Sequence, residues 1–207
     1  MFLVAGSCCL LGVLFNKETH NKETQSPPET PPTSALPPEK LRQYRIRFAQ
    51  IQHNIMQTRR DYDKLVVTWR NIFSWLERGQ ITRLDAFEAF QDIENAARGY
   101  YINWNIPQDF PSDVQDLLSD AKYDYELAFS CLSRAAKAAK DYVNTGSLES
   151  ASEARKAAVQ ASAMIFSAEA KIMQAKISLG FPPPKAKKRF KVGSRFIMNS
   201  QKLEIAF

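Results

Sequence analysis

Residues 112–180 read SDVQDLLSDAKYDYELAFSCLSRAAKAAKDYVNTGSLESASEARKAAVQASAMIFSAEAKIMQAKISLG, and this stretch decides the fold. Apolar or small residues recur along both halves at intervals of four and three, the spacing of a helix face packed lengthwise against another helix. We call each such row a seam. The first seam comprises Val114, Leu118, Ala121, Tyr125, Ala128, Leu132, Ala135, Ala139 and Tyr142. The second comprises Ala151, Ala154, Ala158, Ala161, Ile165, Ala168, Ile172, Ala175 and Leu179.

These two rows predict two long helices joined by a tight turn at Asn144-Thr145-Gly146. Because much of both seams is alanine, the two backbones are expected to approach closely. The second helix is expected to begin near Ser147 or Ser150 and to end at Gly180, where Phe181 would make the apolar contact of a glycine C-cap.

Another long helix is predicted over residues 39–78, with Pro38 at its first position and Gly79 after its end. Its seam is Leu41, Tyr44, Phe48, Ile51, Ile55, Thr58, Tyr62, Leu65, Trp69, Ile72 and Leu76. Of its large aromatic residues, Trp69 and Phe73 are expected in or beside the core and Trp75 at the surface.

A shorter helix is expected to start at Thr82, where Thr82-Arg83-Leu84-Asp85 resembles a capping box. Its apolar row is Leu84, Phe87, Phe90, Ile93, Ala97, Tyr100 and Trp104, and it is expected to bend near Gly99 and to stop at Pro107 and Pro111. Ser112, followed by Gln115, is expected to cap the next helix. Together the pattern predicts an all-α fold: an elongated antiparallel up-and-down bundle of three long helices and one shorter one, with coiled-coil-like seams.

The net charge of +6 resides in one segment. Residues 182–207 hold seven basic residues against Glu204, so residues 1–181 are neutral with 21 basic and 21 acidic groups. Six of the seven are candidates for binding an anionic surface: Lys185, Lys187, Lys188, Arg189, Lys191 and Arg195. This basic tail could be flexible, could form a weak hairpin on the bundle, or could be a basic-aromatic arm.

Residues 1–15 form a continuous apolar run, shorter than the roughly 17–25 residues of a spanning helix. Three interpretations remain: a short membrane anchor with Cys8 and Cys9 as candidate lipidation sites, the remnant of a longer signal, or a buried apolar arm. The membrane interpretations are favoured because no charged residue interrupts the run. Residues 16–38, rich in Pro, Thr and Glu, are expected to form an extended linker to the bundle at 39–181.

Charge also distinguishes the predicted helices. Residues 39–78 carry a net charge of +5 and residues 85–126 a net charge of −8. This difference favours neighbouring positions for the two segments, although ordinary solvated helix faces explain it equally well.

Catalytic motifs are absent from the sequence. His20 and His53 have no metal-ligand or triad spacing, and the seven glycines form no phosphate loop. The row Asp113, Asp116, Asp120 and Asp124 is interpreted as a charged helix face rather than a cation site. Tyr100, Tyr101, Trp104 and Phe110 are expected to cover the core rather than to floor a pocket, and Cys131 is expected to be an inert buried thiol.

These observations favour a non-enzymatic, membrane-tethered scaffold or interaction protein of a bacterial-type cell envelope, without cofactor or metal. Its partner would be another protein, or a second copy bound through helix faces, with the membrane reached through the N-terminus. The alternative is a binder of anionic surfaces, acidic lipid or nucleic acid, through the basic tail; the neutral body disfavours specific nucleic-acid recognition. An enzyme whose site the spacing does not reveal comes third.

Overall fold

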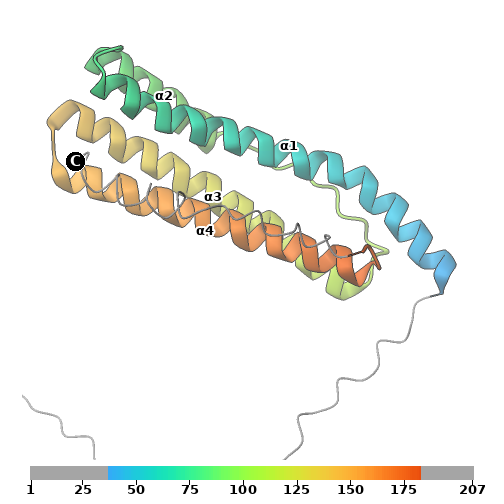
Figure 1. The fold of residues 1–207 in the computed structure, drawn as a ribbon. Coiled ribbons are helices and arrows are strands. Elements are labelled where there is room, and N and C mark those ends of the chain that lie inside the picture. Colours follow the sequence, from blue (N-terminus) through green and yellow to red (C-terminus); the bar gives the residue numbers. More distant parts are fainter. Residues whose placement is uncertain (1–36, 183–207) are drawn as a thin grey trace, which may run out of the picture. The chain divides into compact units, whose positions relative to one another are not determined.

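The computed structural model describes residues 37–182, and these residues form an all-α bundle of four helices (Figure 1). The helices are α1 (Pro38–Glu77), α2 (Arg83–Arg98), α3 (Ser112–Thr145) and α4 (Leu148–Ser178). Successive helices run in opposite directions; short turns join α1 to α2 and α3 to α4, and the longer segment 99–111 joins α2 to α3 (Figure 1). The predicted fold class is therefore confirmed. The segments 1–36 and 183–207, with the expected anchor, most of the linker and the basic tail, lie outside the described residues.

Turn chemistry sets the helix boundaries. Gly146 has a φ of 72° and its amide donates to the Tyr142 carbonyl, which ends α3 in a left-handed conformation that glycine adopts without strain. Ser147 then caps α4 by accepting a hydrogen bond from the Ser150 amide. At the start of α2, Thr82 and Asp85 form the complete capping box that the sequence predicts.

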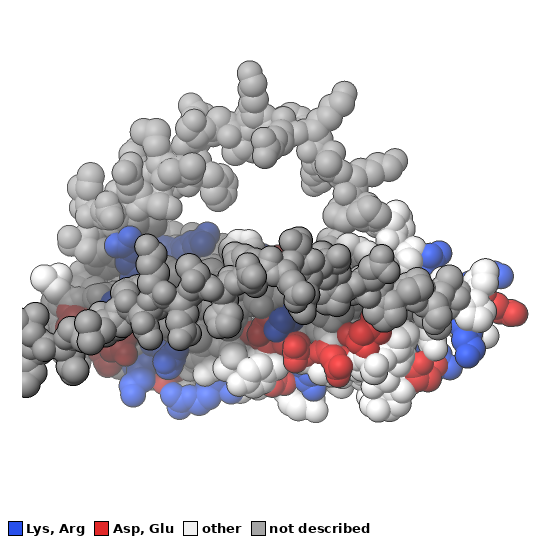
Figure 2. All heavy atoms as spheres, turned by 90° about the horizontal axis from the view of Figure 1, so that it is seen from below, with Lys and Arg blue, Asp and Glu red and all other residues white. Residues whose placement is uncertain are grey.

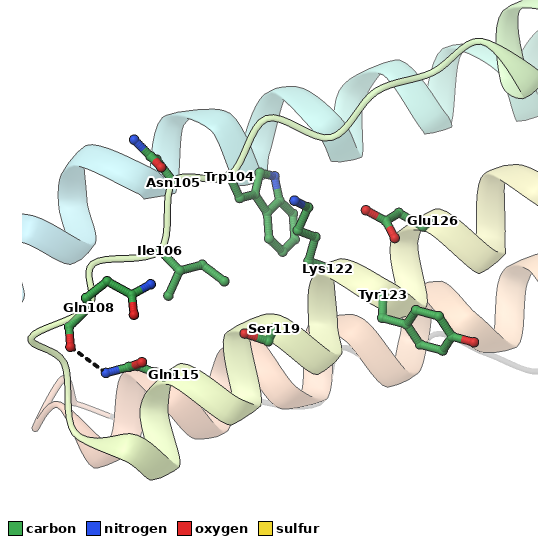
Figure 3. Close-up of a pocket in the computed structure, with 9 residues that line it drawn as sticks. All are labelled: Trp104, Asn105, Ile106, Gln108, Gln115, Ser119, Lys122, Tyr123 and Glu126. Carbon is green, nitrogen blue, oxygen red and sulfur yellow. Dashed lines mark hydrogen bonds between the residues drawn. The ribbon is translucent and has the colours of Figure 1, made fainter.

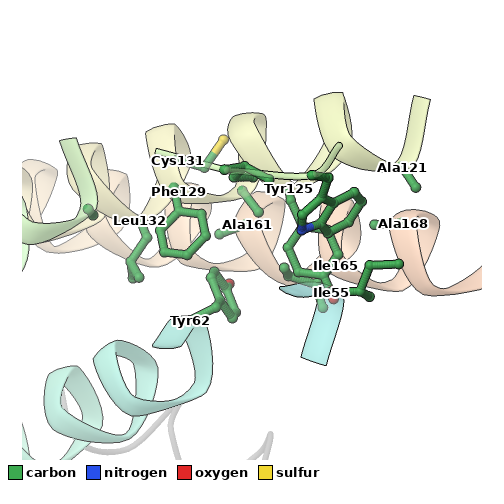
Figure 4. Packing of buried hydrophobic residues seen from close by; sticks show 14 of the residues in the cluster. Ile55, Tyr62, Ala121, Tyr125, Phe129, Cys131, Leu132, Ala161, Ile165 and Ala168 are labelled. Carbon is green, nitrogen blue, oxygen red and sulfur yellow. The ribbon is translucent and has the colours of Figure 1, made fainter. Parts of the chain in front are cut away.

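The α3–α4 pair packs closely along alanine-rich seams. Ala121, Ala128 and Ala139 of α3 are fully buried, as are Ala161 and Ala168 of α4. Figure 4 shows Ala161 and Ala168 on the side of α4 that faces α3. With only a methyl group at each position, the two backbones come near each other, as predicted.

Large side chains fill the space between α1 and this pair. Tyr62 of α1 meets Phe129 of α3 edge-on, with ring centroids 5.6 Å apart (Figure 4). At the end of α4, Gly180 has a φ of 69° and the Phe181 amide donates to the Lys176 carbonyl at 3.0 Å, as in the predicted glycine C-cap, while the Phe181 ring packs against Phe48 of α1 at 5.5 Å. The bundle thus has a thin alanine layer on one side of α3 and a thick aromatic layer on the other.

The second helix is shorter than predicted. It ends at Arg98, and residues 99–111 run beside α1 to the start of α3 without forming a helix or strand, with a turn at 107–110 (Figure 1). Residues alternate there: Ile102 and Trp104 are buried, whereas Tyr101 and Asn103 are exposed. Leu84, expected in the core, is 65% exposed. The expected cap at Ser112 is also wrong, because Ser112 is the first helical residue and Pro111 precedes it without a side-chain bond.

Candidate interaction surface

Side chains of α1 fix segment 99–111 in place. Asn54 donates to the Asn103 carbonyl at 3.1 Å, and the Trp104 indole Nε1 donates to Thr58 Oγ1 at 3.0 Å. The Tyr100 hydroxyl donates to Asp61 at 3.0 Å. Burial of Asp61 raises the pKa of its carboxyl, but hydrogen bonds from Gln57 and Tyr100 outweigh burial and lower that pKa overall.

The aromatic residues of this segment cover the core, as predicted, with one exception. The Tyr100 ring stacks on Phe129 with centroids 4.0 Å apart, Trp104 packs edge-on against Tyr125 at 5.3 Å, and Phe110 is 3% exposed. Tyr101 instead is 80% exposed. Of the other three predicted positions, Trp75 is exposed and Trp69 and Phe73 are half-buried, as expected.

A surface hollow of about 400 Å³ lies between segment 99–111 and α3. Figure 3 shows Trp104 and Ile106 on one side of it and Ser119 and Lys122 on the other. Gln115 closes one end by donating to the Gln108 carbonyl at 2.8 Å. The residues that line the hollow include neither histidine nor cysteine, and the indole nitrogen of Trp104 is engaged by Thr58.

The aspartate row on α3 is divided by burial. Asp113, Asp116 and Asp120 are exposed, whereas Asp124 is buried and its carboxylate lies 2.8 Å from Lys171 Nζ of α4. Figure 2, which views the bundle from below the orientation of Figure 1, shows acidic side chains interspersed with basic ones. Within residues 37–182, no three ligating side chains are grouped as they would be around a metal ion.

Other candidate residues are less informative. Cys131 is buried in α3, as expected, with the Arg134 guanidinium 3.3 Å from its Sγ, and His53 is exposed on α1. The candidate lipidation and anionic-surface residues Cys8, Cys9, Lys185, Lys187, Lys188, Arg189, Lys191 and Arg195 lie outside the described residues. None of the helices formed by residues 37–182 combines the length and apolarity needed to cross a membrane.

One ion pair follows the predicted charge difference between residues 39–78 and residues 85–126, because Arg47 pairs with Asp109, and the other pairs between helices do not. In the described part of the chain, α1 pairs with Glu169 of α4 through Arg59, at 2.6 Å, and with Asp109 through Arg47. The strongly buried pair joins α2 and α3 instead: Lys140 Nζ lies 2.8 Å from the Glu94 carboxylate.

The most distinctive surface lies on the outside of α4. Its apolar and small residues continue the three–four spacing on the face opposite to the seam, and we call this row the outer stripe. The outer stripe consists of Val159, Ala163, Phe166, Ala170, Met173 and Ile177. All six are exposed; Phe166 is 70% exposed and Val159 63%. Sequence reasoning missed this row because only one seam was sought on each helix.

No charge interrupts this surface. The exposed residues between 157 and 178 are the outer stripe plus Gln160, Gln174 and Ser178, none of which is charged. The three charged residues of this span turn to the flanks: Glu169 pairs with Arg59, Lys171 with Asp124, and Lys176 lies over the Phe48 ring at 5.5 Å. A helix that is apolar on two opposite faces is typical of one with neighbours on both sides.

Comparison with protein-family models, with curated proteins and with solved structures gives no match for this chain.

Proposed function

We propose that this chain is a non-enzymatic interaction or scaffold protein, held at a membrane of a bacterial-type envelope by its N-terminal segment. The bundle holds a recognition surface in a fixed geometry, and that surface is the outer stripe of α4. The supporting observation is the exposure of a continuous uncharged face, Val159 to Ile177, on a helix that is packed into the bundle along its other side.

The exposed apolar side chains of the outer stripe have no role within the bundle itself. Exposed apolar side chains contribute nothing to folding where they stand, and contiguous apolar patches on soluble domains mark interaction sites. Phe166 alone would gain roughly 2 kcal/mol of transfer free energy on being covered. Paired glutamines at the edge, Gln160 and Gln174, suit the polar rim of a protein interface.

The proposed tether rests on residues 1–15, an uninterrupted apolar run that precedes a proline-rich stretch. Extended polyproline geometry, at about 3.1 Å per residue, would let residues 16–38 hold the bundle up to ~70 Å from the anchor. Such a spacer allows a surface on the bundle to reach partners that are not at the lipid surface.

Cell fractionation tests the tether. Removal of residues 2–15 should transfer the protein from the membrane pellet to the soluble fraction and leave its helical circular dichroism unchanged. The matched control removes fourteen residues from the linker, 18–31, and should remain in the pellet. Recovery of both truncated chains in the pellet would contradict the proposal. Measurement of the mass of the N-terminal segment distinguishes three forms of the chain: one that is cleaved, one that is acylated at Cys8 or Cys9, and one that is intact.

A second candidate function is binding to an anionic surface through the basic tail. The observation that favours it is the concentration of the entire excess charge, seven basic residues against one acidic, in residues 182–207. Binding to vesicles that contain anionic lipid should weaken steeply with salt and should vanish when the chain ends at Gly180. Retention of binding by the chain that ends at Gly180 would exclude the tail as the binding element.

A further inference from the structure

Side chains of different sizes alternate along the outer stripe. Phe166 and Met173 are large, Ala163 and Ala170 are small, and the medium-sized Val159 and Ile177 stand at the two ends. A helix that packs against this surface must leave room at the levels of Phe166 and Met173 and must place large side chains at the levels of Ala163 and Ala170. This requirement restricts the chemistry of the occupant.

A second copy of α4 meets the requirement in one orientation. When two copies lie antiparallel and are centred on residue 168, Phe166 of each copy faces Ala170 of the other. In the same register Met173 faces Ala163, and Val159 faces Ile177 at both ends. A large side chain thus meets a small one at the inner levels, as close packing between helices requires.

The parallel orientation does not have this property. It would set Phe166 against Phe166 and Ala163 against Ala163, which leaves gaps at the alanine levels and crowding at the aromatic one. Gaps of this kind forfeit dispersion contacts, and crowding forces side chains out of their preferred rotamers. Only the antiparallel register fills the interface evenly.

We infer that the outer stripe of α4 binds the outer stripe of a second copy of this chain, with the two helices antiparallel about residue 168. This inference rests on the proposed function, since it identifies the partner of the surface proposed there. The resulting dimer has a two-fold axis and uses the same patch on both copies, the commonest arrangement among homo-oligomers.

Charges on the flanks are compatible with this arrangement. In the antiparallel register Gln160 approaches Gln174, and Ser167 approaches its own counterpart, so on this flank α4 presents polar, uncharged side chains, and Arg134 of α3 donates to the Gln160 amide oxygen at 3.0 Å. On the other flank Glu169 lies closest to the axis, and its carboxylate is already ion-paired with Arg59 at 2.6 Å. The two copies therefore bring neutralised pairs together rather than bare carboxylates.

The available area predicts a reversible dimer. Two outer stripes with their flanking glutamines would bury on the order of 1,000 Å² in total, the lower limit for a specific interface. Confinement of both copies to one membrane would raise their effective concentration and so favour pairing. A lipid surface is a poorer occupant, because helices that lie on membranes offer Lys and Arg beside a broad apolar face to lipid headgroups, whereas Lys171 is ion-paired with Asp124 and Lys176 lies over the Phe48 ring.

The first experiment measures association of the full chain in mild detergent by sedimentation velocity over a range of concentrations. The unmodified chain should show a monomer–dimer equilibrium. Phe166→Glu should raise the dissociation constant of the dimer by about tenfold or more, since the substitution places a charge in a desolvated contact. The matched control is Tyr101→Glu, which changes another exposed aromatic residue outside the stripe and should leave the equilibrium unchanged. Circular dichroism checks that both variants remain folded.

The second experiment tests the register by disulfide cross-linking. In a background with Cys8→Ser, Cys9→Ser and Cys131→Ala, one population carries Ala163→Cys and another carries Met173→Cys. Mixed populations should form a disulfide-linked dimer under mild oxidation, whereas each population alone should not. Cross-linking of the Ala163→Cys population by itself would indicate a parallel pair and would overturn the register.

Other results decide the remaining alternatives. A chain that stays monomeric throughout, or a Phe166→Glu variant that dimerises as well as the unmodified chain, overturns the inference. If dimers form only after removal of residues 1–15 or 183–207, the removed segment covers the outer stripe in the full chain. That result would also overturn the inference. The outcome is independent of the tether, because fractionation of the 2–15 deletion reports on membrane attachment whether or not the chain dimerises.

Discussion

Lys140 of α3 reaches across to Glu94 of α2, with its ammonium nitrogen 2.8 Å from the carboxylate and with both side chains largely withdrawn from solvent. Lys140 also donates to Gln91 and lies 5.3 Å from the centroid of the Phe87 ring, while Arg98 supplies a second cation to Glu94 at the surface. This cluster is the main polar connection between α2 and α3.

Removal of the lysine from this cluster should destabilise the bundle. Lys140→Met leaves the Glu94 carboxylate buried with only the exposed Arg98, and we expect a loss of roughly 3 kcal/mol in the free energy of unfolding, measured with urea. The double variant Glu94→Leu/Lys140→Met should recover much of that loss, because no buried charge remains. The control Lys64→Met removes an exposed partner of Asp61 and should change stability by less than about 0.5 kcal/mol. If Lys140→Met and Lys64→Met lower the free energy of unfolding equally, burial of Glu94 does not contribute to the effect of Lys140→Met.

Thr58 is expected to matter through its bond to the indole of Trp104. Its hydroxyl donates to the Asn54 carbonyl at 2.9 Å and accepts from Trp104 Nε1. Thr58→Val retains the shape but leaves the buried indole N–H unpaired, at a cost of about 1–3 kcal/mol in unfolding free energy. Thr68 is a matched control, because its hydroxyl makes the same bond to Lys64 on an exposed face of α1. Thr68→Val should be nearly neutral, and a Thr58→Val loss no larger than that of Thr68→Val would contradict the assignment.

The alanine layer between α3 and α4 should not tolerate larger residues. Ala168 is completely buried, and Ala168→Leu would force the two backbones apart, with an expected cost of about 1–3 kcal/mol. Ala49→Leu makes the same change at an exposed position of α1, where helix propensity is nearly unaffected. Thermal unfolding followed by circular dichroism compares the two variants, and a similar melting temperature for both would refute close packing at Ala168.

Alkaline pH should weaken the bundle through two buried tyrosines. Burial raises the pKa of Tyr62 and the pKa of Tyr125 to about 12, compared with about 10 in an unfolded chain. Because the folded state holds these protons more tightly, the stabilisation is complete below about pH 10 and is lost as the pH rises through about 12.

Urea unfolding across this pH range measures the effect. The double variant Tyr62→Phe/Tyr125→Phe should show a smaller decline of unfolding free energy with pH than the unmodified chain. Deprotonation of lysine affects both proteins alike and cancels in the comparison. Identical slopes would mean that the two hydroxyls do not contribute.

Most of the fold follows from helix periodicity. The seams of α1, α3 and α4 can be recognised in the sequence because the residues of a buried helix face recur at intervals of three and four. The Gly146 turn and the Thr82 capping box can be recognised because each is a local structure with clear residue preferences. The end of α2 was misjudged because Tyr100 and Trp104 happen to continue the same spacing beyond Gly99. A competing signal was present: Ile102 and Trp104 alternate with polar asparagines, which is the period of extended chain.

The candidate surface could also have been found from the sequence. The outer stripe repeats at the same intervals as the seam of α4, displaced to the other side of the helix, and a helix apolar on two sides indicates two neighbours. Burial of Asp124 and Glu94 could not be foreseen in this way. Each depends on a lysine from another helix, Lys171 or Lys140, and the sequence spacing within one helix carries no information on such partners.

The non-helical segment between Arg98 and Ser112 makes the bundle unevenly tolerant of changes in chain length. One residue added inside α3 would turn everything beyond it by about 100° and misalign its seam with α4. Extra residues near Asn105 to Gln108, which lie outside any helix, could form a surface loop without rotating the helices on either side. Homologues of this protein, or variants selected for folding, should therefore gain and lose residues here more readily than anywhere else between Pro38 and Ser178.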